Sequence, residues 1–569
     1  MFNIFYSKEV FFGFTSNTKA MKNIFIVLFS LCIQLKAQFV PTTTWTFGIN
    51  SACFGGAACA DLDNDGKKEI VFATYNNDGK VYCLNAENGS LKWAYNIGGC
   101  GDVAVNIYDL NMDGQLDVFV NGSCNPTAFC FNGNTGALTW SVASGGGDSP
   151  ATIADIDLDG KPEVVFGNFS GQIRVLNGEN GSLAKNIQVF TANLQTEPVL
   201  TDVNADGSLD IIVANYNNSG NTYSVQCFDY NTSLPIWTNT ISVINTSHAY
   251  HGGALADIDK DGKLEYVIGA NNGMVRALNV EDGSVIWTVN NPSQQAFFAI
   301  SIADVNKDDT LDVIYHRSGG IELLNGYNGK VEWTYTLSLG GSFRGSAVTD
   351  LNGNGKLDLV SSHYMGKVEA VEPFTGALWT FNTLPYFPNY PTTIPYILSD
   401  NAPLVADFDN DGALDVFFVM GYGTYTVNPN STGIAFMIKG GVGTCPEWTM
   451  FRHDHNRTGY ISTAEVNTQC SIINGIKENS STQLNVKLSP LPFTDKIKIS
   501  VSGMNMKKAT LTIKDLQGRV IELKTSEQSQ IKENEIVWEW NGEKVQEGIY
   551  LYFIEDGYSY ANGKLIKVN

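Results

Sequence analysis

Asp61-Leu62-Asp63-Asn64-Asp65-Gly66-Lys67-Lys68-Glu69 is an acidic stretch of nine residues, and the apolar run Ile70-Val71-Phe72-Ala73 follows it directly. Seven more stretches share the pattern, and their starts lie 46 to 57 residues apart. They begin at Asp109, Asp155, Asp202, Asp257, Asp304, Asp350 and Asp407. Because a run rich in β-branched and aromatic residues follows each copy, every copy predicts a loop that leads into a strand.

The spacing of oxygen-bearing side chains within the loop predicts a cation site. Carboxylate or amide groups at positions 1, 3 and 5 of a tight turn converge on one point, and an acid at position 9 closes the cage. Six to eight oxygens at roughly 2.3 to 2.6 Å suit Ca²⁺ better than Mg²⁺. An EF-hand loop begins with the same pattern of oxygen-bearing residues, but its closing Glu is at position 12 and a helix follows it. The predicted Ca²⁺ ligands are Asp61, Asp63, Asp65, Glu69, Asp109, Asn111, Asp113, Asp117, Asp155, Asp157, Asp159, Glu163, Asp202, Asn204, Asp206, Asp210, Asp257, Asp259, Asp261, Glu265, Asp304, Asn306, Asp308, Asp312, Asp350, Asn352, Asn354, Asp358, Asp407, Asp409, Asp411 and Asp415.

Ordinary turn chemistry is the alternative explanation for any one loop, because Asp-Gly and Asn-Gly pairs are common in turns. Over eight copies it is insufficient. Positions 1, 3, 5, 6 and 9 hold 28 of the chain's 58 acidic residues, and such closely packed like charges repel unless a cation neutralises them. We therefore expect up to eight Ca²⁺ sites, with full cages in the first, third, fifth and eighth loops. The sixth and seventh are expected to be weakest, because Asp309 replaces the turn Gly and Asn352 and Asn354 replace acids.

The net charge limits the possible partners of the protein, and the N-terminal segment indicates its cellular compartment. The net charge of −22 argues against nucleic acid and anionic membrane surfaces as partners. Met21-Lys22-Asn23, followed by the apolar stretch Ile24–Ile33, predicts a cleaved signal peptide over residues 21–37. Ten apolar residues are too few for a membrane span, so no transmembrane segment is expected after signal removal. Residues 1–20 are interpreted as an extension upstream of the true start.

Nine cysteines remain after signal removal, and no spacing among them matches a zinc site. Cys83, Cys130 and Cys227 recur at one strand position and are interpreted as small buried core residues. The disulfide pairs considered are Cys53 with Cys100 and Cys445 with Cys470.

Each repeat divides into four predicted strands, which span residues 56–60, 69–75, 79–85 and 91–95 in the first copy. Repeats of this length with several strands each predict an all-β fold, a β-propeller with one blade per repeat. The last repeat lacks a fourth strand, and residues 42–47 near the mature N-terminus are expected to supply it and close the ring. Eight blades is the simplest count, and seven blades plus an irregular pair is the alternative.

A Gly-containing turn precedes a Trp in the fourth strand of several repeats. Packing between blades is the expected role of these tryptophans, because large aromatic side chains dominate such cores, and a ligand platform is the alternative. They are Trp93, Trp140, Trp287, Trp333 and Trp379.

The propeller is expected to span residues 38–460. Its last part, Glu447–Gly459, contains His453-Asp454-His455 and is interpreted as a seal, with a metal or catalytic role as the alternative. Residues 461–483 are rich in Ser, Asn and Thr, which indicates a linker. Residues 484–569 alternate polar and apolar side chains between closely spaced turns, which predicts a small β-sandwich.

The acidic loops, together with Phe54-Gly55-Gly56-Ala57 just upstream of the first, resemble the FG-GAP or VCBS-type repeats of integrin alpha subunits and bacterial surface proteins. The resemblance covers about residues 40–440 and implies a calcium-stabilised β-propeller. The Gly-x-x-x-Trp turns are also similar to those of quinoprotein propellers. The chain lacks the adjacent cysteine pair of quinoprotein dehydrogenases, so their cofactor is not expected.

The last residues resemble the type A sorting domain of the type IX secretion system of Bacteroidetes. The matching segments are Pro490-Leu491-Pro492-Phe493, Asp515–Arg519, Gly548-Ile549-Tyr550 and Lys564–Lys567. Leu491 stands where the family has Asn, which is a small departure. The resemblance implies export by the type IX machinery, followed by release or attachment to the outer-membrane surface.

Three functions remain open at this point. The leading hypothesis is a secreted calcium-binding propeller that binds an extracellular glycan or protein, with the insertions at residues 245–251 and 384–396 as candidate surfaces. The rival is a polysaccharide lyase, which needs a base and a cation that stabilises the developing charge. A purely structural surface scaffold is the third, and binding is favoured over catalysis. The imidazoles available to a lyase are His248, His251, His316 and His363.

Overall fold

The computed structural model divides the chain into two compact units, Met1–Ile472 and Ile473–Asn569. The predicted upstream extension, signal peptide and linker lie outside the described residues. Within the described part, no helix is long and apolar enough to cross a bilayer. The structure describes residues 39–189, 193–217, 222–242, 251–270, 273–291, 299–317, 319–337, 344–363, 366–388, 401–422, 432–443, 445–448, 450, 453, 485–490, 493–502, 510–514, 520–525, 530–532, 535–542, 545, 548–555 and 560–567.

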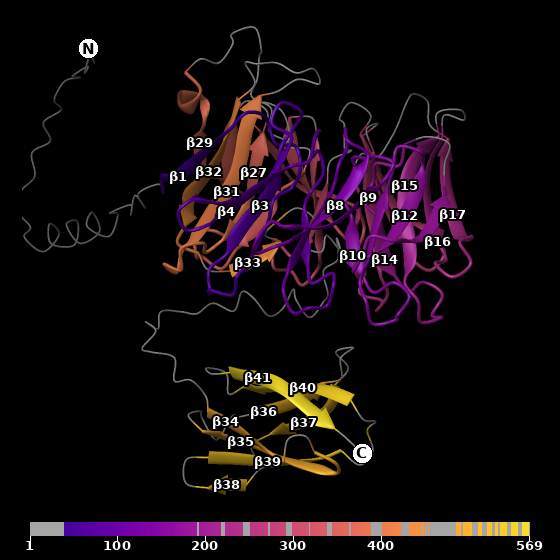
Figure 1. The fold of residues 1–569 in the computed structure, drawn as a ribbon, viewed down its shortest axis with the longest axis vertical. Coiled ribbons are helices and arrows are strands. Elements are labelled where there is room, and N and C mark those ends of the chain that lie inside the picture. Colours follow the sequence, from indigo (N-terminus) through magenta and orange to yellow (C-terminus); the bar gives the residue numbers. More distant parts are fainter. Residues whose placement is uncertain are drawn as a thin grey trace, which may run out of the picture. The chain divides into compact units, whose positions relative to one another are not determined.

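The first unit consists of antiparallel sheets that follow one another along the chain, coloured from indigo to orange in Figure 1. The first sheet contains β2 (Ala58–Ala60), β3 (Glu69–Ala73), β4 (Lys80–Asn85) and β5 (Leu91–Asn96) in this order. The next six sheets repeat the order with β6 (Asn106–Tyr108), β7 (Asp117–Asn121), β8 (Thr127–Asn132), β9 (Leu138–Ala143); β10 (Thr152–Ala154), β11 (Glu163–Gly167), β12 (Gln172–Asn177), β13 (Leu183–Gln188); β14 (Val199–Thr201), β15 (Asp210–Asn217), β16 (Thr222–Phe228), β17 (Pro235–Ser242); β18 (Ala254–Ala256), β19 (Glu265–Ala270), β20 (Met274–Asn279), β21 (Val285–Asn290); β22 (Ile300–Ala303), β23 (Asp312–Arg317), β24 (Gly320–Asn325), β25 (Val331–Thr336); and β26 (Ala347–Asp350), β27 (Asp358–His363), β28 (Lys367–Glu372), β29 (Gly376–Asn382). The eighth sheet contains β30 (Leu404–Ala406), β31 (Leu414–Tyr422), β32 (Thr432–Gly441) and β1 (Thr43–Ile49).

Each acidic loop joins the first strand of a sheet to the second. The acid at position 9 is paired with the last residue of the first strand, as Glu69 is with Ala60. All residues of β3 are buried, which explains its unbroken apolar run. Because consecutive strands are antiparallel, the acidic loops share one end of the propeller, here called the loop end. The connections between sheets leave from the opposite end.

The N-terminal strand closes the ring, as predicted from residues 42–47. β1 pairs with β32, with Trp45 opposite Met437, and the two lie side by side in Figure 1. Trp45 also belongs to an apolar core that includes Phe72 of the first sheet. Similar apolar cores join each of the remaining pairs of neighbouring sheets. In the described residues, apolar cores thus join each sheet of the first unit to the next and the last sheet to the first.

The segment interpreted as a seal begins with β33 (Cys445–Trp448), which follows the eighth sheet. β33 pairs with residues 348–350 of β26 and adds a fifth strand to the seventh sheet. Met450 is buried in the core shared by the eighth and first sheets. Asp454 and His455 lie outside the described residues, so the metal or catalytic interpretation of this segment stays a prediction.

Tryptophans of the fourth strands pack between sheets, as expected for most of them. The Trp93 indole donates a hydrogen bond to the carbonyl of Gly133 in the next sheet (2.7 Å), and Gly136 of the same turn lies over the ring. The same arrangement joins Trp140 to Gly178 and Trp287 to Gly326. Three further tryptophans donate an indole hydrogen bond to a backbone carbonyl in the same way, and they are Trp45, Trp237 and Trp379.

Trp333 departs from this pattern. Its ring is only partly buried and packs against Phe374, with ring centroids 6.2 Å apart. Phe374 has a φ of 66° at a position where five of the other turns have Gly. In the third sheet Lys185 takes the place of Trp, because it lies opposite Val175 as Trp93 lies opposite Cys83.

The disulfide prediction for Cys53 and Cys100 is wrong. Cys100 is bonded to Cys124, whereas Cys53 is a buried free thiol. Cys53 lies beside Asn401 of the eighth sheet, whose side-chain amide also donates to Gly55 (3.0 Å). The prediction of small buried core residues is confirmed for Cys83, Cys130 and Cys227. Cys470 lies outside the described residues, so its pairing with Cys445 stays a prediction.

The second unit is a β-sandwich, as predicted. Side chains from both of its sheets, among them Ile499, Trp538, Ile513 and Tyr550, form one core. One sheet contains β34 (Asn485–Ser489), β35 (Lys496–Ser502), β39 (Glu535–Asn541) and β38 (Gln530–Lys532); the other contains β37 (Val520–Thr525), β36 (Thr510–Lys514), β40 (Gly548–Glu555) and β41 (Tyr560–Lys567).

Candidate functional site

The acidic loop folds around its own carboxylates. In the first loop, Asp61 accepts hydrogen bonds from the backbone N–H groups of Asp65 (3.1 Å) and Gly66 (2.9 Å). Asp65 accepts from Lys67, and Glu69 accepts from Leu62 (2.8 Å each). Each of these acids thus uses one or both oxygens to hold the turn. The remaining oxygens face the space that the loop encloses.

Backbone conformation is shared by all eight loops. Position 4 has a φ between 57° and 69° in every copy, and the Gly at position 6 has a φ between 82° and 95°. Asp309 occupies position 6 of the sixth loop at a φ of 66°. The sixth loop therefore keeps the common backbone shape although Asp309 replaces Gly. The sequence predicts that this backbone shape has a conformational cost for a non-Gly residue.

Oxygens of the acids at positions 1, 3 and 9 come together in the four loops that have acids at all of these positions. They lie within 4.8 Å of one another. These four are the loops for which the sequence predicts full cages. The residues are Asp61, Asp63 and Glu69; Asp155, Asp157 and Glu163; Asp257, Asp259 and Glu265; and Asp407, Asp409 and Asp415.

The two oxygens of the position 9 acid have different surroundings. One of its oxygens accepts the N–H of position 2, as Glu265 Oε2 does from Ile258 (2.8 Å). In six loops the other oxygen is buried and has no hydrogen-bond partner among the described residues, although in the eighth loop Lys439 Nζ lies 3.1 Å from it. These oxygens are Asp117 Oδ1, Asp210 Oδ1, Glu265 Oε1, Asp312 Oδ1, Asp358 Oδ1 and Asp415 Oδ1.

Burial raises the pKa of several position 9 acids. Burial, with a smaller contribution from neighbouring acids, raises the pKa of Glu265 and Asp312 to about 8. The same causes raise the pKa of Glu163 to about 7 and of Asp117 to about 6. A buried carboxylate with an unpartnered oxygen is costly unless a cation balances it. The all-oxygen donor set therefore fits a hard divalent cation.

Two lysines reach into acidic loops, and the sequence pattern did not reveal them. Lys92 on β5 forms ion pairs with Asp63 and with Glu69 (3.3 Å) in the first loop. In the eighth loop, Lys439 on β32 lies 2.7 Å from Asp409 Oδ2 and 2.7 Å from Asp411 Oδ2. Partial burial lowers the pKa of Lys439, but these carboxylates outweigh that effect and hold the pKa above its ordinary value.

Acidic side chains from outside the loop reach three loops that have Asn at position 3. The Asn204 amide donates to Asp229 (3.2 Å), the Asn306 amide to Glu332 of β25 (2.9 Å), and the Asn352 amide to Glu372 of β28 (3.1 Å). Glu372 therefore adds a carboxylate to the seventh loop that a count of the loop's own acids leaves out.

At the opposite end, Arg344 lies where the first strands of the sheets begin. Its guanidinium donates to the carbonyls of Phe54 and Asp102 (2.9 Å each). Its Nη1 is 3.8 Å from Glu197 Oε1 and 3.4 Å from His251 Nδ1. These residues precede the first strands of the first, second, fourth and fifth sheets, and Arg344 precedes that of the seventh. One buried guanidinium thus connects five sheets.

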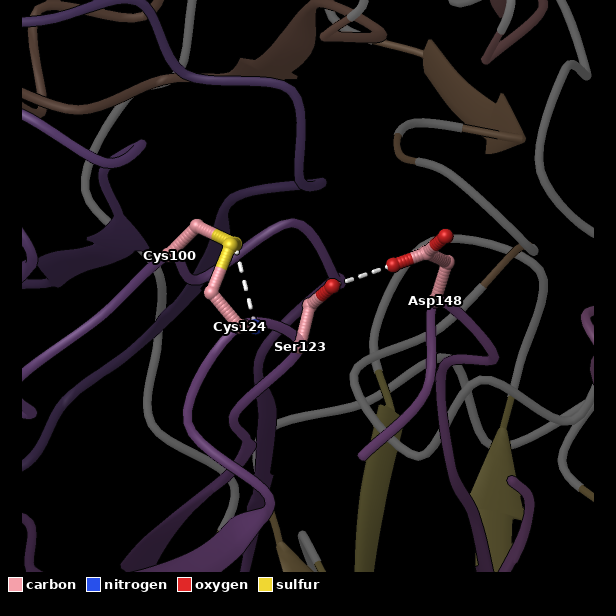
Figure 2. Close-up of a disulfide and its surroundings, with 4 residues drawn as sticks. All are labelled: Cys100, Ser123, Cys124 and Asp148. Atoms are coloured by element: carbon pink, nitrogen blue, oxygen red, sulfur yellow. Dashed lines mark hydrogen bonds between the residues drawn. A yellow bond between two sulfur atoms is a disulfide. The ribbon is translucent and has the colours of Figure 1, made fainter. Parts of the chain in front are cut away.

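The disulfide lies at the same end, between the first and second sheets. Figure 2 shows Ser123, next to Cys124, pointing towards Asp148 of the third sheet, and the hydroxyl donates a hydrogen bond to this carboxylate. The Gln195 amide donates to the other oxygen of Asp148 (3.0 Å). This polar group links three consecutive sheets.

The histidines considered for catalysis are buried where the structure describes them. His316 and His363 have no exposed surface, and His251 is 2% exposed. The His316 ring is 2.7 Å from Ser346 Oγ, and burial, together with the neighbouring His363, lowers the pKa of His316 to about 3. His248 lies outside the described residues.

A pocket of about 620 Å³ lies at the loop end, between the seventh and eighth sheets. Leu378 and Trp379 of β29 form its apolar wall, together with Phe39 and Val442. Asn352, Asn354 and Glu372 of the seventh loop region supply its polar groups. Sequence patterns did not indicate this pocket, because it combines the N-terminus with two sheets.

The family model that describes the outer membrane protein assembly factor BamB matches residues 60–265 and 251–385, which is more than half of the chain. The chain belongs to this family. The match covers propeller repeats, and the resemblance to FG-GAP or VCBS-type repeats stays a prediction. No curated protein matches the chain.

A second family model, the secretion system C-terminal sorting domain, matches residues 487–568. The prediction of a type IX sorting domain is thereby confirmed. The sorting domain indicates that this BamB-family propeller is exported by the type IX system and is then secreted or held at the cell surface.

Solved structures share the fold at low sequence identity. The biofilm matrix protein Bap1 of V. cholerae is similar with a TM-score of 0.51 and 13% identity, over 74% of this chain and 96% of Bap1. Quinohemoprotein alcohol dehydrogenase from Comamonas testosteroni has a TM-score of 0.50 and 11% identity, over 71% and 77%. BamB from Moraxella catarrhalis has a TM-score of 0.46 and 13% identity, over 70% and 99%.

Proposed function

We propose that the chain is a calcium-stabilised propeller of FG-GAP-like loops that binds an extracellular glycan after export by a type A sorting domain of the Bacteroidetes kind. The observation that carries the calcium proposal is the buried oxygen of the position 9 acid that accepts no hydrogen bond, which recurs in six loops. A cation that met all the loop oxygens would remove this desolvation cost at each loop. Extracellular modules bind Ca²⁺ with Kd values of about 10⁻⁴ to 10⁻³ M, which suits a secreted protein.

Removal of calcium tests this proposal. A ligand that binds only the folded state at one hundred times its Kd adds about 2.7 kcal/mol of stability per site. We expect a chelator to lower the melting temperature of the full chain by many degrees, and added Ca²⁺ to restore it where equal Mg²⁺ does not. A melting curve that the chelator leaves unchanged contradicts the proposal.

The pocket at the loop end supports ligand binding. Its volume of about 620 Å³ lies in the range of small-ligand sites, and it pairs apolar walls with a few polar groups. Aromatic and apolar walls with amide and carboxylate groups suit a saccharide, which presents both C–H faces and hydroxyls. The two insertions considered as binding surfaces fall largely outside the described residues, and their flanking strands end at the opposite end of the propeller.

A glycan array with the calcium-loaded chain identifies the ligand. Val442 is 68% exposed at the pocket, so Val442→Arg is expected to fill the mouth and abolish glycan binding without loss of folding. Tyr327→Ala is the matched control, because Tyr327 is 60% exposed on a loop-end turn outside the pocket. Unchanged binding by Val442→Arg rejects the pocket as the site.

The lyase alternative receives less support. A general base must reach the substrate proton, whereas His251, His316 and His363 are buried. A rise in ultraviolet absorbance from unsaturated sugar products would restore the lyase hypothesis. A chain that binds no glycan or protein partner would favour the scaffold.

A further inference from the structure

The eight acidic loops differ in what faces the closing acid. On the third strand of each sheet, one residue lies opposite position 9. It is Asn in five sheets, with Asn279 opposite Glu265 as an example. In the eighth sheet this residue is Lys439, opposite Asp415. The other four are Asn85, Asn132, Asn177 and Asn325.

Lys439 brings its ammonium to the oxygens that a cation would contact. It lies 2.7 Å from Asp409 Oδ2, 2.7 Å from Asp411 Oδ2 and 3.1 Å from Asp415 Oδ1. These are the oxygens of positions 3, 5 and 9 that do not hold the turn, because the loop N–H groups bind Asp411 Oδ1 and Asp415 Oδ2. An ammonium with three donors satisfies three such acceptors.

Lys92 does the same in the first loop from a different strand. It pairs with Asp63 Oδ2 and with Glu69 Oε1, the oxygen of Glu69 that does not accept from Leu62. The residues at the corresponding place in the next six sheets, one before the Trp or its replacement, include no basic side chain. They are Thr139, Ala184, Ile236, Ile286, Glu332 and Leu378.

The same oxygen of the position 9 acid is buried without a hydrogen-bond partner in the second, fourth, fifth, sixth and seventh loops. In the eighth loop this oxygen, Asp415 Oδ1, also accepts no hydrogen bond, but the Lys439 ammonium lies 3.1 Å from it, and in the first loop the Lys92 ammonium lies 3.3 Å from Glu69 Oε1. An ammonium therefore lies beside this oxygen in the first and eighth loops. In the second, fourth, fifth, sixth and seventh loops, a different cation would be needed to balance it.

We propose that Lys92 and Lys439 replace calcium in the first and eighth loops, so that the two sheets at which the ring closes hold their loops without a metal ion. This inference rests on the proposed calcium binding by the other loops. The first and eighth sheets are neighbours and share the core that contains Trp45. The closing contact of the ring is then independent of calcium, while the remaining loops gain stability from it.

A count of bound calcium tests the inference on the full chain after chelation, dialysis against Ca²⁺ and elemental analysis. Lys439→Met and Lys92→Met keep the apolar stem and remove the ammonium. Each is expected to bind one more Ca²⁺ per chain than the wild type, and the double variant two more. Lys263→Met is the control with no expected change, because Lys263 is paired with Glu281 outside its cage (2.8 Å).

Carboxamide variants give a second readout that does not depend on the lysine variants. Asp415→Asn in the eighth loop is expected to leave the wild-type count unchanged, whereas Asp312→Asn in the sixth is expected to lower it by one. A wild-type count of eight, unchanged counts in both methionine variants, or loss of an ion in Asp415→Asn overturns the inference while calcium binding stands. A wild-type chain that binds no calcium overturns the proposed function itself.

Discussion

Single residues set the differences among loops of one shape. Seven loops have Gly at position 6 with a φ of at least 82°, and the sixth has Asp309 at 66°. An L-residue in this region meets its own carbonyl, at a cost of roughly 1 to 2 kcal/mol, although Asp tolerates it better than most. Asp309→Gly is therefore expected to stabilise the protein by about 0.5 to 1 kcal/mol. Urea unfolding of the calcium-free chain measures the change.

The reciprocal substitution is the control. Gly262→Asp places the same side chain at the same position of the fifth loop, where φ is 88° and nothing lies within 4 Å of an added Cβ. It is expected to destabilise the calcium-free chain by about the same amount. If both substitutions lower stability, the backbone explanation fails and the Asp309 carboxylate has a role of its own.

The positions of the loop acids followed from the sequence, but their neighbours did not. The acids at positions 1, 3, 5 and 9 belong to one loop of nine residues, so their spacing in the sequence was enough to predict that they lie close together. Lys439 is 24 residues beyond Asp415, and only the register of β31 against β32 makes them neighbours. Arg344 connects five sheets through contacts up to 290 residues apart. No local pattern encodes such contacts.

At the scale of the element, the turn before each fourth strand doubles as part of the contact between sheets. The ring of Trp93 lies under Gly136, and a Cβ added to Gly136 would be 2.5 Å from that ring. Gly136 also has a φ of 68°. Gly136→Ala is expected to lower the free energy of unfolding by about 2 to 5 kcal/mol, through backbone strain and overpacking together.

Gly319→Ala separates these two causes. Gly319 has a φ of 82° in the turn between β23 and β24, and nothing lies within 4 Å of an added Cβ. Its substitution is expected to cost only the strain, about 1 to 2 kcal/mol. Equal losses of stability in the two variants, measured by urea unfolding, would show that the tryptophan contact adds nothing.

The elements were predictable where residue type and period agree. Strand order, the closing strand and the packing role of most tryptophans followed from repeated spacing. The third sheet was not predictable, because Lys185 replaces Trp and its ammonium donates to the carbonyl of Asn231 (3.1 Å) and lies 4.1 Å from the centre of the Tyr230 ring. Cys100 pairs with Cys124 rather than Cys53, and both partners lie in connections at the opposite end. The prediction relied on equivalent positions in adjacent repeats, which do not show which cysteines are close in space.

For the whole molecule, ring closure joins the beginning and the end of the propeller. β1 covers β32, which would otherwise be an exposed sheet edge. Trp45 contributes to the core between the eighth and first sheets and donates to the Ala86 carbonyl (2.8 Å). At the end opposite the acidic loops, Arg344 provides a second connection that does not involve β1. Loss of β1 should therefore open one seam without unfolding every sheet.

A chain that lacks residues 39–49 tests this expectation. The free edge of β32 is expected to pair between molecules, so the truncated chain should elute as oligomers in size-exclusion chromatography with light scattering. A synthetic peptide of residues 39–49, added in excess, should restore the monomer by taking the place of β1. The same peptide with Trp45→Ala should restore it poorly, because the indole supplies the packing and the hydrogen bond across the seam. A truncated chain that stays monomeric with an unchanged melting temperature would show that Arg344 and the remaining cores close the ring without β1.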